Sequence, residues 1–312
     1  MFYHLVTTPD STQVVKRALE KANLTIVLTT RNSVIIVNIK DGSNDEIAFK
    51  KIISKISDHI VKSTPVKSYL NVEDVDLHES LRTNKCRFVF DVDSTLTQGD
   101  PGVLPPTIEH ILNKMNEKGI RIYFATGRSM PDLNELIKKY PIEKHSIAEN
   151  GGLILGFPPD NYHEFGKKTE PNKVLDYLQT KYQINEDMEQ GERFTEVIFL
   201  KKDVTIAKID EAIRKTKARI SVHPSKNSFH ISKHGINKGS AMLEVGKRLH
   251  WGNALVIAVG DADMDIPLFE KAGYSFAVGN ASDGAKKAAK KVLNGKFDTG
   301  IAEIYGIIKN VA

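Results

Sequence analysis

The sequence predicts an α/β protein with three parts: a parallel sheet covered by helices on both faces, an inserted α+β cap, and a small α+β domain at the N-terminus. The sheet is indicated by short, nearly continuous apolar runs, such as residues 86–90 and 254–260, which alternate with helix-like segments from Lys85 onwards. The insert is indicated by a change of pattern. Between residues 156 and 234 the runs alternate polar and apolar side chains, as antiparallel strands with one exposed face do.

The first 84 residues form a predicted domain without a chemical motif. Strand-like runs cover residues 2–6, 24–30 and 33–39, and amphipathic helices are expected over 11–22 and 44–62. Residues 63–80 are interpreted as an edge of this domain and a linker. One hypothesis for the domain is a binding or assembly module, so that the protein forms homo-oligomers through it or through the cap.

The catalytic core is predicted at residues 85–155 and 235–312, with the cap at 156–234 between its two halves. In the first half, the strand 86–90 is followed by a helix over 107–119, a strand over 120–125, and a helix that Ser129 opens in a Ser-x-x-Asp pattern. In the second half, a helix over 236–249 and the strand 254–260 precede a further helix, strand and helix. This alternation predicts a parallel sheet.

Composition narrows the class of protein. Lys and Arg number 44 against 39 Asp and Glu, a surplus too small to indicate a nucleic-acid binder. The single cysteine, Cys86, excludes an internal disulfide and fits a reducing cytoplasm. No apolar run is long enough to cross a bilayer, and the N-terminus has no secretory-signal pattern, so a cytoplasmic protein without a membrane partner is expected.

Acidic side chains follow two of the predicted core strands. Asp91 and Asp93 come directly after the strand 86–90, and Asp261 and Asp265 come after the strand 254–260. Because ligands bind outside the carboxyl ends of strands in open parallel sheets, these residues are expected to converge. Carboxylates gathered in one crevice repel one another, and a hard cation with oxygen ligands removes that repulsion. The residues therefore predict a Mg²⁺ site.

Lys238 stands in an unusual place for a cation, in the first turn of a predicted helix. A positive charge there opposes the helix dipole by about 0.3–1 kcal/mol when exposed. An anion held between Lys238, the hydroxyl of Thr126 at another strand end, and loop amides would explain the placement. The anion that suits both Mg²⁺ and lysine is phosphate.

These residues occur in an order that resembles a known family. Asp91-x-Asp93-x-Thr95, a strand ending in Thr126, then Lys238 and Gly260-Asp261-x-x-x-Asp265 are similar to the four motifs of the haloacid dehalogenase superfamily of phosphatases. The insert between Thr126 and Lys238 resembles the type IIB cap of that superfamily. The segments ATGR, AENGG and NKGSAM narrow the resemblance to the group containing archaeal phosphoglycolate phosphatases and sucrose-phosphate phosphatases. The resemblance covers residues 86–312 and implies a Rossmann-like core.

The resemblance implies a role for each motif residue. Asp91 would attack phosphorus and Asp93 would act as general acid and base. Mg²⁺ would be held by Asp91, the backbone carbonyl of Asp93 and Asp261, with Asp265 completing the site directly or through water. The phosphoryl oxygens would be bound by Thr126, the Gly127 amide and Lys238, and Arg128 and Asn150 stand where this branch contacts substrate. Two positions depart from the family pattern: Ser94 replaces a usual Gly, and Met264 replaces a common Asn.

Simpler interpretations apply to several polar residues. Arg128 fits a surface ion pair as well as a substrate contact, and Asp265 fits a helix cap as well as a ligand. The histidines of the insert, His223, His230 and His234, are interpreted as packing or surface residues. Arg193 and Lys202 could bind a substrate carboxylate, but a solvated strand face is the expectation for both.

The expected function is a Mg²⁺-dependent phosphomonoester hydrolase that acts on a small phosphorylated metabolite through an aspartyl-phosphate. Phosphoglycolate is the first substrate the resemblance suggests, and a sugar phosphate is the alternative. A receiver-type signalling domain also gathers Asp, Thr and Lys around Mg²⁺ and stays a separate hypothesis, although it does not need the insert or the distal Asp261 motif.

Overall fold

A computed structural model describes most of the chain from Cys86 onwards and parts of the chain before it. The described residues are 2–7, 15, 17–19, 25–29, 34–38, 52, 54, 60–66, 77, 81, 86–98, 103–187, 193–225 and 227–311. The contacts between residues divide the chain into two compact units, Met1–Glu79 and Ser80–Ala312. No helix among the described residues is long and apolar enough to cross a membrane.

The centre of the second unit is a five-stranded sheet in which every pair of neighbours is parallel. Its order is β15 (Lys291–Val292), β14 (Tyr274–Ala277), β13 (Leu255–Gly260), β5 (Cys86–Phe90) and β6 (Arg121–Phe124). The predicted parallel sheet is confirmed. Its central strands are nearly continuous apolar runs because both of their faces are covered.

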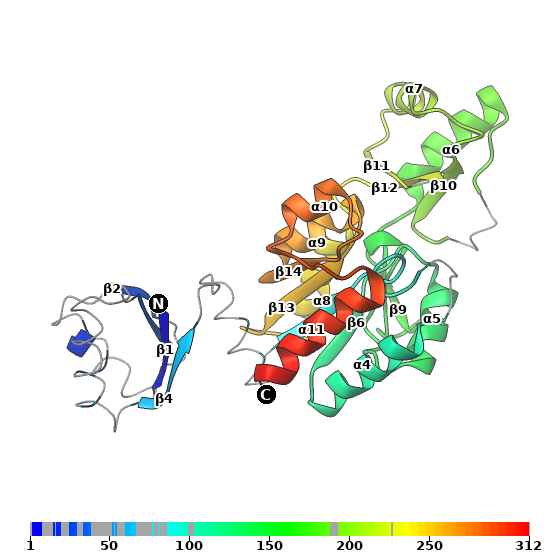
Figure 1. The fold of residues 1–312 in the computed structure, drawn as a ribbon. Helices are drawn as coiled ribbons and strands as arrows, with labels where there is room; N and C mark the ends of the chain where they lie inside the picture. Colours follow the sequence, from blue (N-terminus) through cyan, green and yellow to red (C-terminus); the bar gives the residue numbers. More distant parts are fainter. Residues whose placement is uncertain are drawn as a thin grey trace. The chain divides into compact units, whose positions relative to one another are not determined.

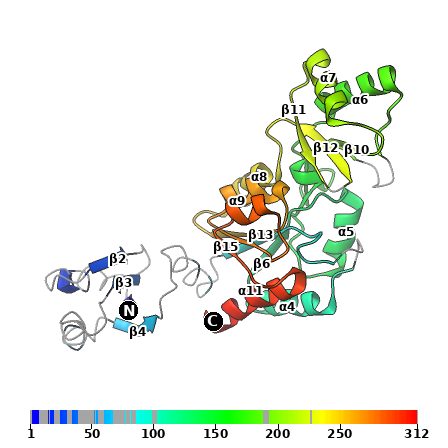
Figure 2. The same cartoon turned by 45° about the horizontal axis from the view of Figure 1, so that its top comes forward.

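Helices cover both faces of this sheet (Figure 2). On one face α4 (Pro106–Glu117) packs against α11 (Phe297–Val311), and on the other α8 (Lys238–Arg248) packs against α9 (Ile266–Lys271). The remaining core helices are α5 (Met130–Lys139) and α10 (Asp283–Ala288). The side chain of Ser129 caps α5 by accepting a hydrogen bond from the amide of Asp132, as the Ser-x-x-Asp pattern predicts.

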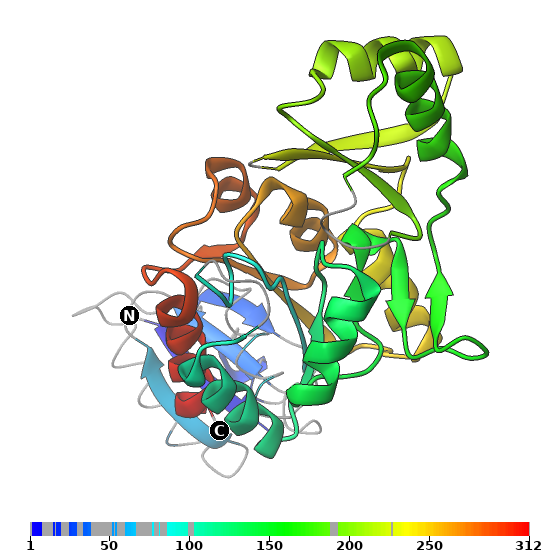
Figure 3. The same cartoon turned by 90° about the vertical axis from the view of Figure 1, so that its right-hand side faces the viewer.

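The insert contains an antiparallel sheet with two helices. Strands β10 (Glu196–Leu200), β12 (Ser228–Lys233) and β11 (Ile220–Pro224) form the sheet in that order, and α6 (Thr169–Tyr182) and α7 (Ile206–Thr216) pack on it (Figure 1). Figure 3 shows both helices on the side of the sheet that faces away from the core. Buried apolar side chains fill the layer between them, including Val174, Leu178, Val197, Phe199 and Ile231.

A second antiparallel sheet joins the insert to the core. It contains β7 (Ile147–Ala148), β8 (Leu153–Leu155) and β9 (Tyr162–Glu164). The predicted boundary between residues 155 and 156 falls within this sheet. The division into core and cap by residue number therefore stays a prediction, while the antiparallel insert itself is confirmed.

The first unit contains a four-stranded antiparallel sheet in the order β2 (Thr25–Thr29), β3 (Val34–Asn38), β1 (Phe2–Thr7) and β4 (Ile60–Val66). The helix predicted over 44–62 extends too far, because residues 60–62 belong to β4. That strand lies at the sheet edge, where Pro65 is tolerated although it donates no ladder hydrogen bond. Most residues of the two predicted helices lie outside the described residues.

Candidate active site

Two strand ends bring the predicted carboxylates together. Asp91 follows β5 and its amide donates to the carbonyl of Val259 in β13, at 2.8 Å. The hydroxyl of Thr95 contacts Asp91 Oδ2 at 3.2 Å and Asp261 Oδ1 at 2.9 Å. One hydroxyl therefore lies within hydrogen-bond distance of carboxylates that are far apart in the sequence, as expected for adjacent parallel strands.

Lys238 lies at the base of this cluster. Its Nζ donates to Asp91 Oδ1 at 2.6 Å and to Asp265 Oδ1 at 2.7 Å, and the three side chains are at most 7% exposed. Burial lowers the pKa of Lys238, but Asp265 and Asp91 outweigh it, so the net shift of the pKa is upward. The lysine is held charged at a helix N-terminus because two buried carboxylates surround it.

The start of α8 is shaped for close contact with its neighbours. Asn237 caps the helix by accepting from the amide of Ser240 at 2.8 Å. A Cβ at Gly239 would lie 2.0 Å from the carbonyl oxygen of Pro267, so only glycine lets the two chains approach this closely. This approach places Lys238 beside Asp265.

Asp265 is fully buried and serves two contacts at once. Its Oδ1 accepts a hydrogen bond from Lys238 Nζ, while its Oδ2 accepts from the amides of Asp261 and Ala262 at 2.9 and 3.0 Å. A Cβ at Gly260 would lie 2.4 Å from Oδ2, which explains the glycine before Asp261. Asp265 therefore stabilises the turn after β13 and does not cap α9 with its side chain, while its role as a metal ligand stays a prediction.

Three carboxylates can hold a metal ion together. Asp91, Asp261 and Asp265 each offer an oxygen, and these oxygens lie within 4.8 Å of one another. Burial, followed by the charge of Asp265, raises the pKa of Asp261 to about 6. Burial likewise raises the pKa of Asp91 well above its usual range, with Lys238 opposing this and the neighbouring carboxylates adding to it. Carboxylates that repel one another around one point form an oxygen donor set that fits a hard divalent cation.

Asp93 lies apart from this acidic group. Its side chain is 47% exposed and forms an ion pair with Arg128, at 2.6 Å from Nη2 and 3.0 Å from Nε. Of the two alternatives for Arg128, the structure shows the ion pair, although the Arg128 side chain is buried and not at the surface. A contact between Arg128 and substrate stays a prediction. The next residue, Ser94, has φ of 63°, which explains why the family pattern usually has glycine at this position.

The loop after β6 brings Thr126, Gly127 and Asn150 together. Thr126 Oγ1 accepts from the amide of Arg128 at 3.1 Å, and the carbonyl of Thr126 accepts from the amide of Asn150 at 3.0 Å. A Cβ at Gly127 would lie 3.0 Å from Asn150 Oδ1, a tight contact for any other residue. Asn150 adopts φ of 53° and its side-chain Nδ2 donates to Glu196 Oε2 at 3.1 Å.

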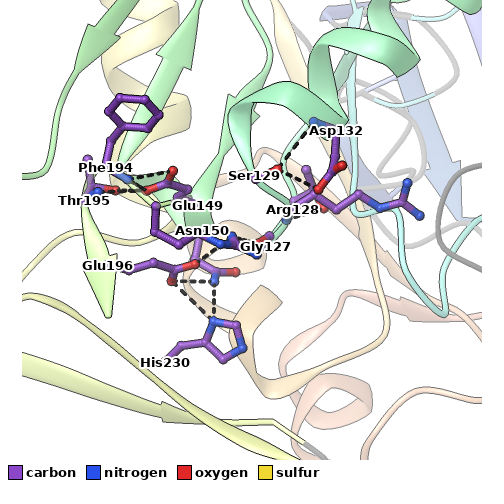
Figure 4. A network of polar contacts seen from close by, with 12 residues as sticks. Gly127, Arg128, Ser129, Asp132, Glu149, Asn150, Phe194, Thr195, Glu196 and His230 are labelled. Carbon is purple, nitrogen blue, oxygen red and sulfur yellow. Dashed lines mark hydrogen bonds and ion pairs between the residues drawn. The ribbon is translucent and has the colours of Figure 1, made fainter. Parts of the chain in front are cut away.

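A buried polar network from the insert meets this loop, and sequence reasoning missed most of it (Figure 4). Arg193 was expected on a solvated face, but its side chain is buried and donates to the carbonyl of Gly127 and to Glu196. His230, expected to be a packing or surface residue, is buried and lies 3.3 Å from Glu196 Oε2. The first four residues of β10 are all buried, so the polar–apolar alternation wrongly predicted one solvated face. The sequence signal for a buried polar contact was the charged Glu196 within the apolar run TEVIFL.

Glu149 joins the core to the insert. Its carboxylate accepts from the amides of Phe194 and Thr195 and from the Thr195 hydroxyl, at 2.7–3.1 Å. Burial raises the pKa of Glu149, and the hydrogen bond from Thr195 opposes that rise. Glu149 lies within the AENGG segment, but the sequence alone predicts no role for it.

A cavity of about 1240 Å³ lies between the acidic cluster and the insert. Core residues on its wall include Asp91, Asp93, Gly127, Arg128, Asn150, Lys238 and Asp261, and the insert contributes Arg193, Ser225 and His230. Thr126 lies outside this lining and is fully buried. The predicted site residues thus surround one space, apart from Thr126 and the buried Asp265 beneath it.

Comparison with known proteins gives the same picture. The family profile of haloacid dehalogenase-like hydrolases matches residues 88–185 and 161–304. A phosphoglycolate phosphatase from Nitrosopumilus maritimus is 28% identical over 219 residues, which are 70% of this chain and 94% of that protein. A 5-amino-6-(5-phospho-D-ribitylamino)uracil phosphatase from Bacillus subtilis is 25% identical, over 68% of this chain and 91% of that protein.

Solved structures share the fold. A protein from Thermoplasma acidophilum superposes with a TM-score of 0.62 at 20% identity, over 72% of this chain and 97% of that one. A subclass IIB sugar phosphatase superposes with a TM-score of 0.56 at 17% identity, over 71% of this chain and 99% of that one. With the profile matched over more than half of its length, the chain belongs to the haloacid dehalogenase-like hydrolases, and the predicted resemblance and the predicted enzyme class are confirmed.

Proposed function

We propose that the protein is a Mg²⁺-dependent phosphomonoester hydrolase that works through an aspartyl-phosphate on Asp91. The observation that carries the proposal is the buried cluster in which Lys238 joins Asp91 to Asp265 while Asp261 lies beside them. Asp91, Asp261 and Asp265 would hold the ion, with the backbone carbonyl of Asp93 as a further ligand. When bound, the ion would offset the repulsion between these carboxylates and an approaching phosphate.

Each step uses a residue of this cavity. An Asp91 carboxylate oxygen forms a bond to phosphorus as the bond to the leaving oxygen breaks, and Asp93 gives a proton to that oxygen. Asp93 then takes a proton from the water that attacks phosphorus, which releases inorganic phosphate and restores Asp91. Lys238 and the Gly127 amide, which line the cavity, would bind the phosphoryl oxygens during both steps. The Thr126 hydroxyl, predicted to join them, is buried behind this lining and accepts from the Arg128 amide.

Phosphoglycolate is the first proposed substrate, because several relatives at 26–28% identity are phosphoglycolate phosphatases. A hydroxyl-rich ester such as a sugar phosphate is the second, and one observation favours it. Among the described residues that line the cavity, each lysine and arginine already contacts a carboxylate: Arg128 contacts Asp93, Arg193 contacts Glu196, and Lys238 contacts Asp91. A substrate carboxylate would have to compete with these pairs, whereas hydroxyl groups would not.

Assays with p-nitrophenyl phosphate and with a panel of phosphorylated metabolites test the proposed reaction and the proposed substrate. Multiple turnover of p-nitrophenyl phosphate that stops in EDTA and returns with Mg²⁺ supports the reaction. A single phosphoryl transfer without turnover would instead fit a receiver-type domain. The ratio of kcat/KM for phosphoglycolate to that for hexose phosphates then selects the substrate. Phosphate release that is unaffected by EDTA would refute the metal assignment.

A further inference from the structure

The Gly127–Arg128 peptide lies between the two halves of the candidate site. Its N–H, which belongs to Arg128, donates to the Thr126 hydroxyl at 3.1 Å. Its carbonyl, which belongs to Gly127, accepts from Arg193 Nη1 of the insert at 2.5 Å. The side chain of Arg128, the residue that follows this carbonyl, forms the ion pair with Asp93. The orientation of this peptide plane therefore affects where the Arg128 side chain starts and, through the ion pair, where Asp93 lies.

Arg193 is held in place from its own side of the cavity. Its Nη1 contacts Glu196 Oε1 at 3.0 Å, with side chains 5% and 0% exposed. The other oxygen of Glu196 is within 3.1 Å of Asn150 Nδ2 and 3.3 Å of His230 Nδ1. Burial would raise the pKa of Glu196, but His230, Arg193 and Asn150 outweigh it and lower the pKa, so the carboxylate stays charged. A buried, charge-assisted contact of this kind fixes the guanidinium in one position.

The backbone of the insert is also held by Glu149, a core residue whose amide donates to the Arg128 carbonyl at 3.0 Å. The Glu149 carboxylate accepts from the amides of Phe194 and Thr195, which directly follow Arg193. A Cβ at Gly152 would lie 1.7 Å from Thr195 Oγ1, so the two segments touch closely. The contacts run in both directions: the core holds the backbone of the insert, and the insert holds a backbone carbonyl of the core.

We propose that Arg193 is a positioning residue for the hydrolysis, which is an inference that rests on the proposed function. By donating to the Gly127 carbonyl, it orients the Gly127–Arg128 peptide and thereby holds Arg128 and Asp93 in register with Asp91. The contact between the insert and the core thus determines where the proposed acid–base residue, Asp93, is positioned. Arg193 acts through the peptide and not by binding substrate.

The test compares variants by kcat, KM and melting temperature with p-nitrophenyl phosphate and Mg²⁺. Arg193→Lys keeps a charge near Glu196, but a single ammonium does not reproduce the fork of donors. Arg193→Met/Glu196→Gln removes both buried charges, so no unpaired carboxylate prevents folding. Glu196→Gln alone is the reference for this double variant. Arg121→Met is the control, since Arg121 lies at the start of β6, at the end opposite the Gly127 loop, and forms a partly exposed ion pair with Glu143.

Both Arg193 variants are expected to lose about ten- to a hundredfold in kcat relative to their references, with KM changed less than threefold. A rise in KM with unchanged kcat would make Arg193 a substrate ligand and overturn the proposal. A lower melting temperature with unchanged kcat would make it structural and also overturn it. The wild-type assay keeps the two claims separate: no turnover by wild type refutes the proposed function itself.

Discussion

Replacing Lys238 with methionine should destabilise the core strongly, because it removes the one cation between two buried carboxylates. Lys238 Nζ lies 2.6 Å from Asp91 and 2.7 Å from Asp265, and none of the three side chains is more than 7% exposed. Methionine has a similar length, so lost charge dominates over lost volume. Breaking a buried ion pair from one side costs about 3–5 kcal/mol.

Urea unfolding in EDTA at pH 7.5 measures this loss through the single tryptophan, Trp251. Its ring packs on Tyr123 with centroids 4.9 Å apart, so its fluorescence reports on the core. Lys247→Met, on the exposed side of the same helix, is the matched control and should change the free energy of unfolding by less than about 0.5 kcal/mol.

The pH dependence of the loss provides a second check. Because the pKa of Asp91 is already raised by burial, its carboxyl takes up a proton more readily than a free one. The deficit of Lys238→Met should therefore shrink between pH 7.5 and pH 5, and Mg²⁺ should reduce it at pH 7.5. A loss below about 1 kcal/mol in EDTA, or one equal to that of Lys247→Met, would refute the reasoning.

Further predictions concern the carboxylates. Asp91→Asn should abolish turnover of p-nitrophenyl phosphate without lowering the melting temperature in EDTA, because it removes one charge from a repelling cluster; detectable wild-type-like turnover would exclude Asp91 as nucleophile. Asp93→Ala should slow turnover by about 10²–10⁴-fold, and acid quenching during turnover should reveal more phosphorylated enzyme than in wild type. The pKa of Asp261 is raised to about 6 in the fold, so its protonated form favours folding at low pH and this contribution is lost as pH rises through 6; Mg²⁺ should therefore raise the melting temperature more at pH 8 than at pH 5, and an equal effect at both would count against this ligand. Glu149→Ala should lower the free energy of unfolding by about 1–3 kcal/mol, because the buried amides of Phe194 and Thr195 lose their acceptor, while Glu149→Gln should lose less.

The role of the first unit stays a prediction. Its sheet is described, but most of its helical segments are not, and the proposed assembly role rests on the sequence alone. Comparing the oligomeric state and turnover of the full chain with those of a chain lacking residues 1–84 would test it. An unchanged oligomeric state would refute assembly through this unit.

The sequence by itself determined the parallel core and the meeting of Asp91 with Asp261. Both depend on local signals, since an apolar run marks a buried strand and the carboxyl ends of neighbouring parallel strands share one edge. Lys238 was also recognisable, because a cation in the first turn of a helix contradicts the helix dipole unless something compensates it.

Only the tertiary structure decided how the insert meets this edge. The contact of Arg193 with the Gly127 carbonyl and the contacts of Glu196 with Asn150 and His230 join segments that no local periodicity relates. The alternation around Arg193 predicted a solvated face, and it failed because Arg193 contacts the Gly127 carbonyl of the core and the buried Glu196. Whether a polar side chain in a strand meets water or a buried partner depends on what packs above it, and that is a property of the folded chain.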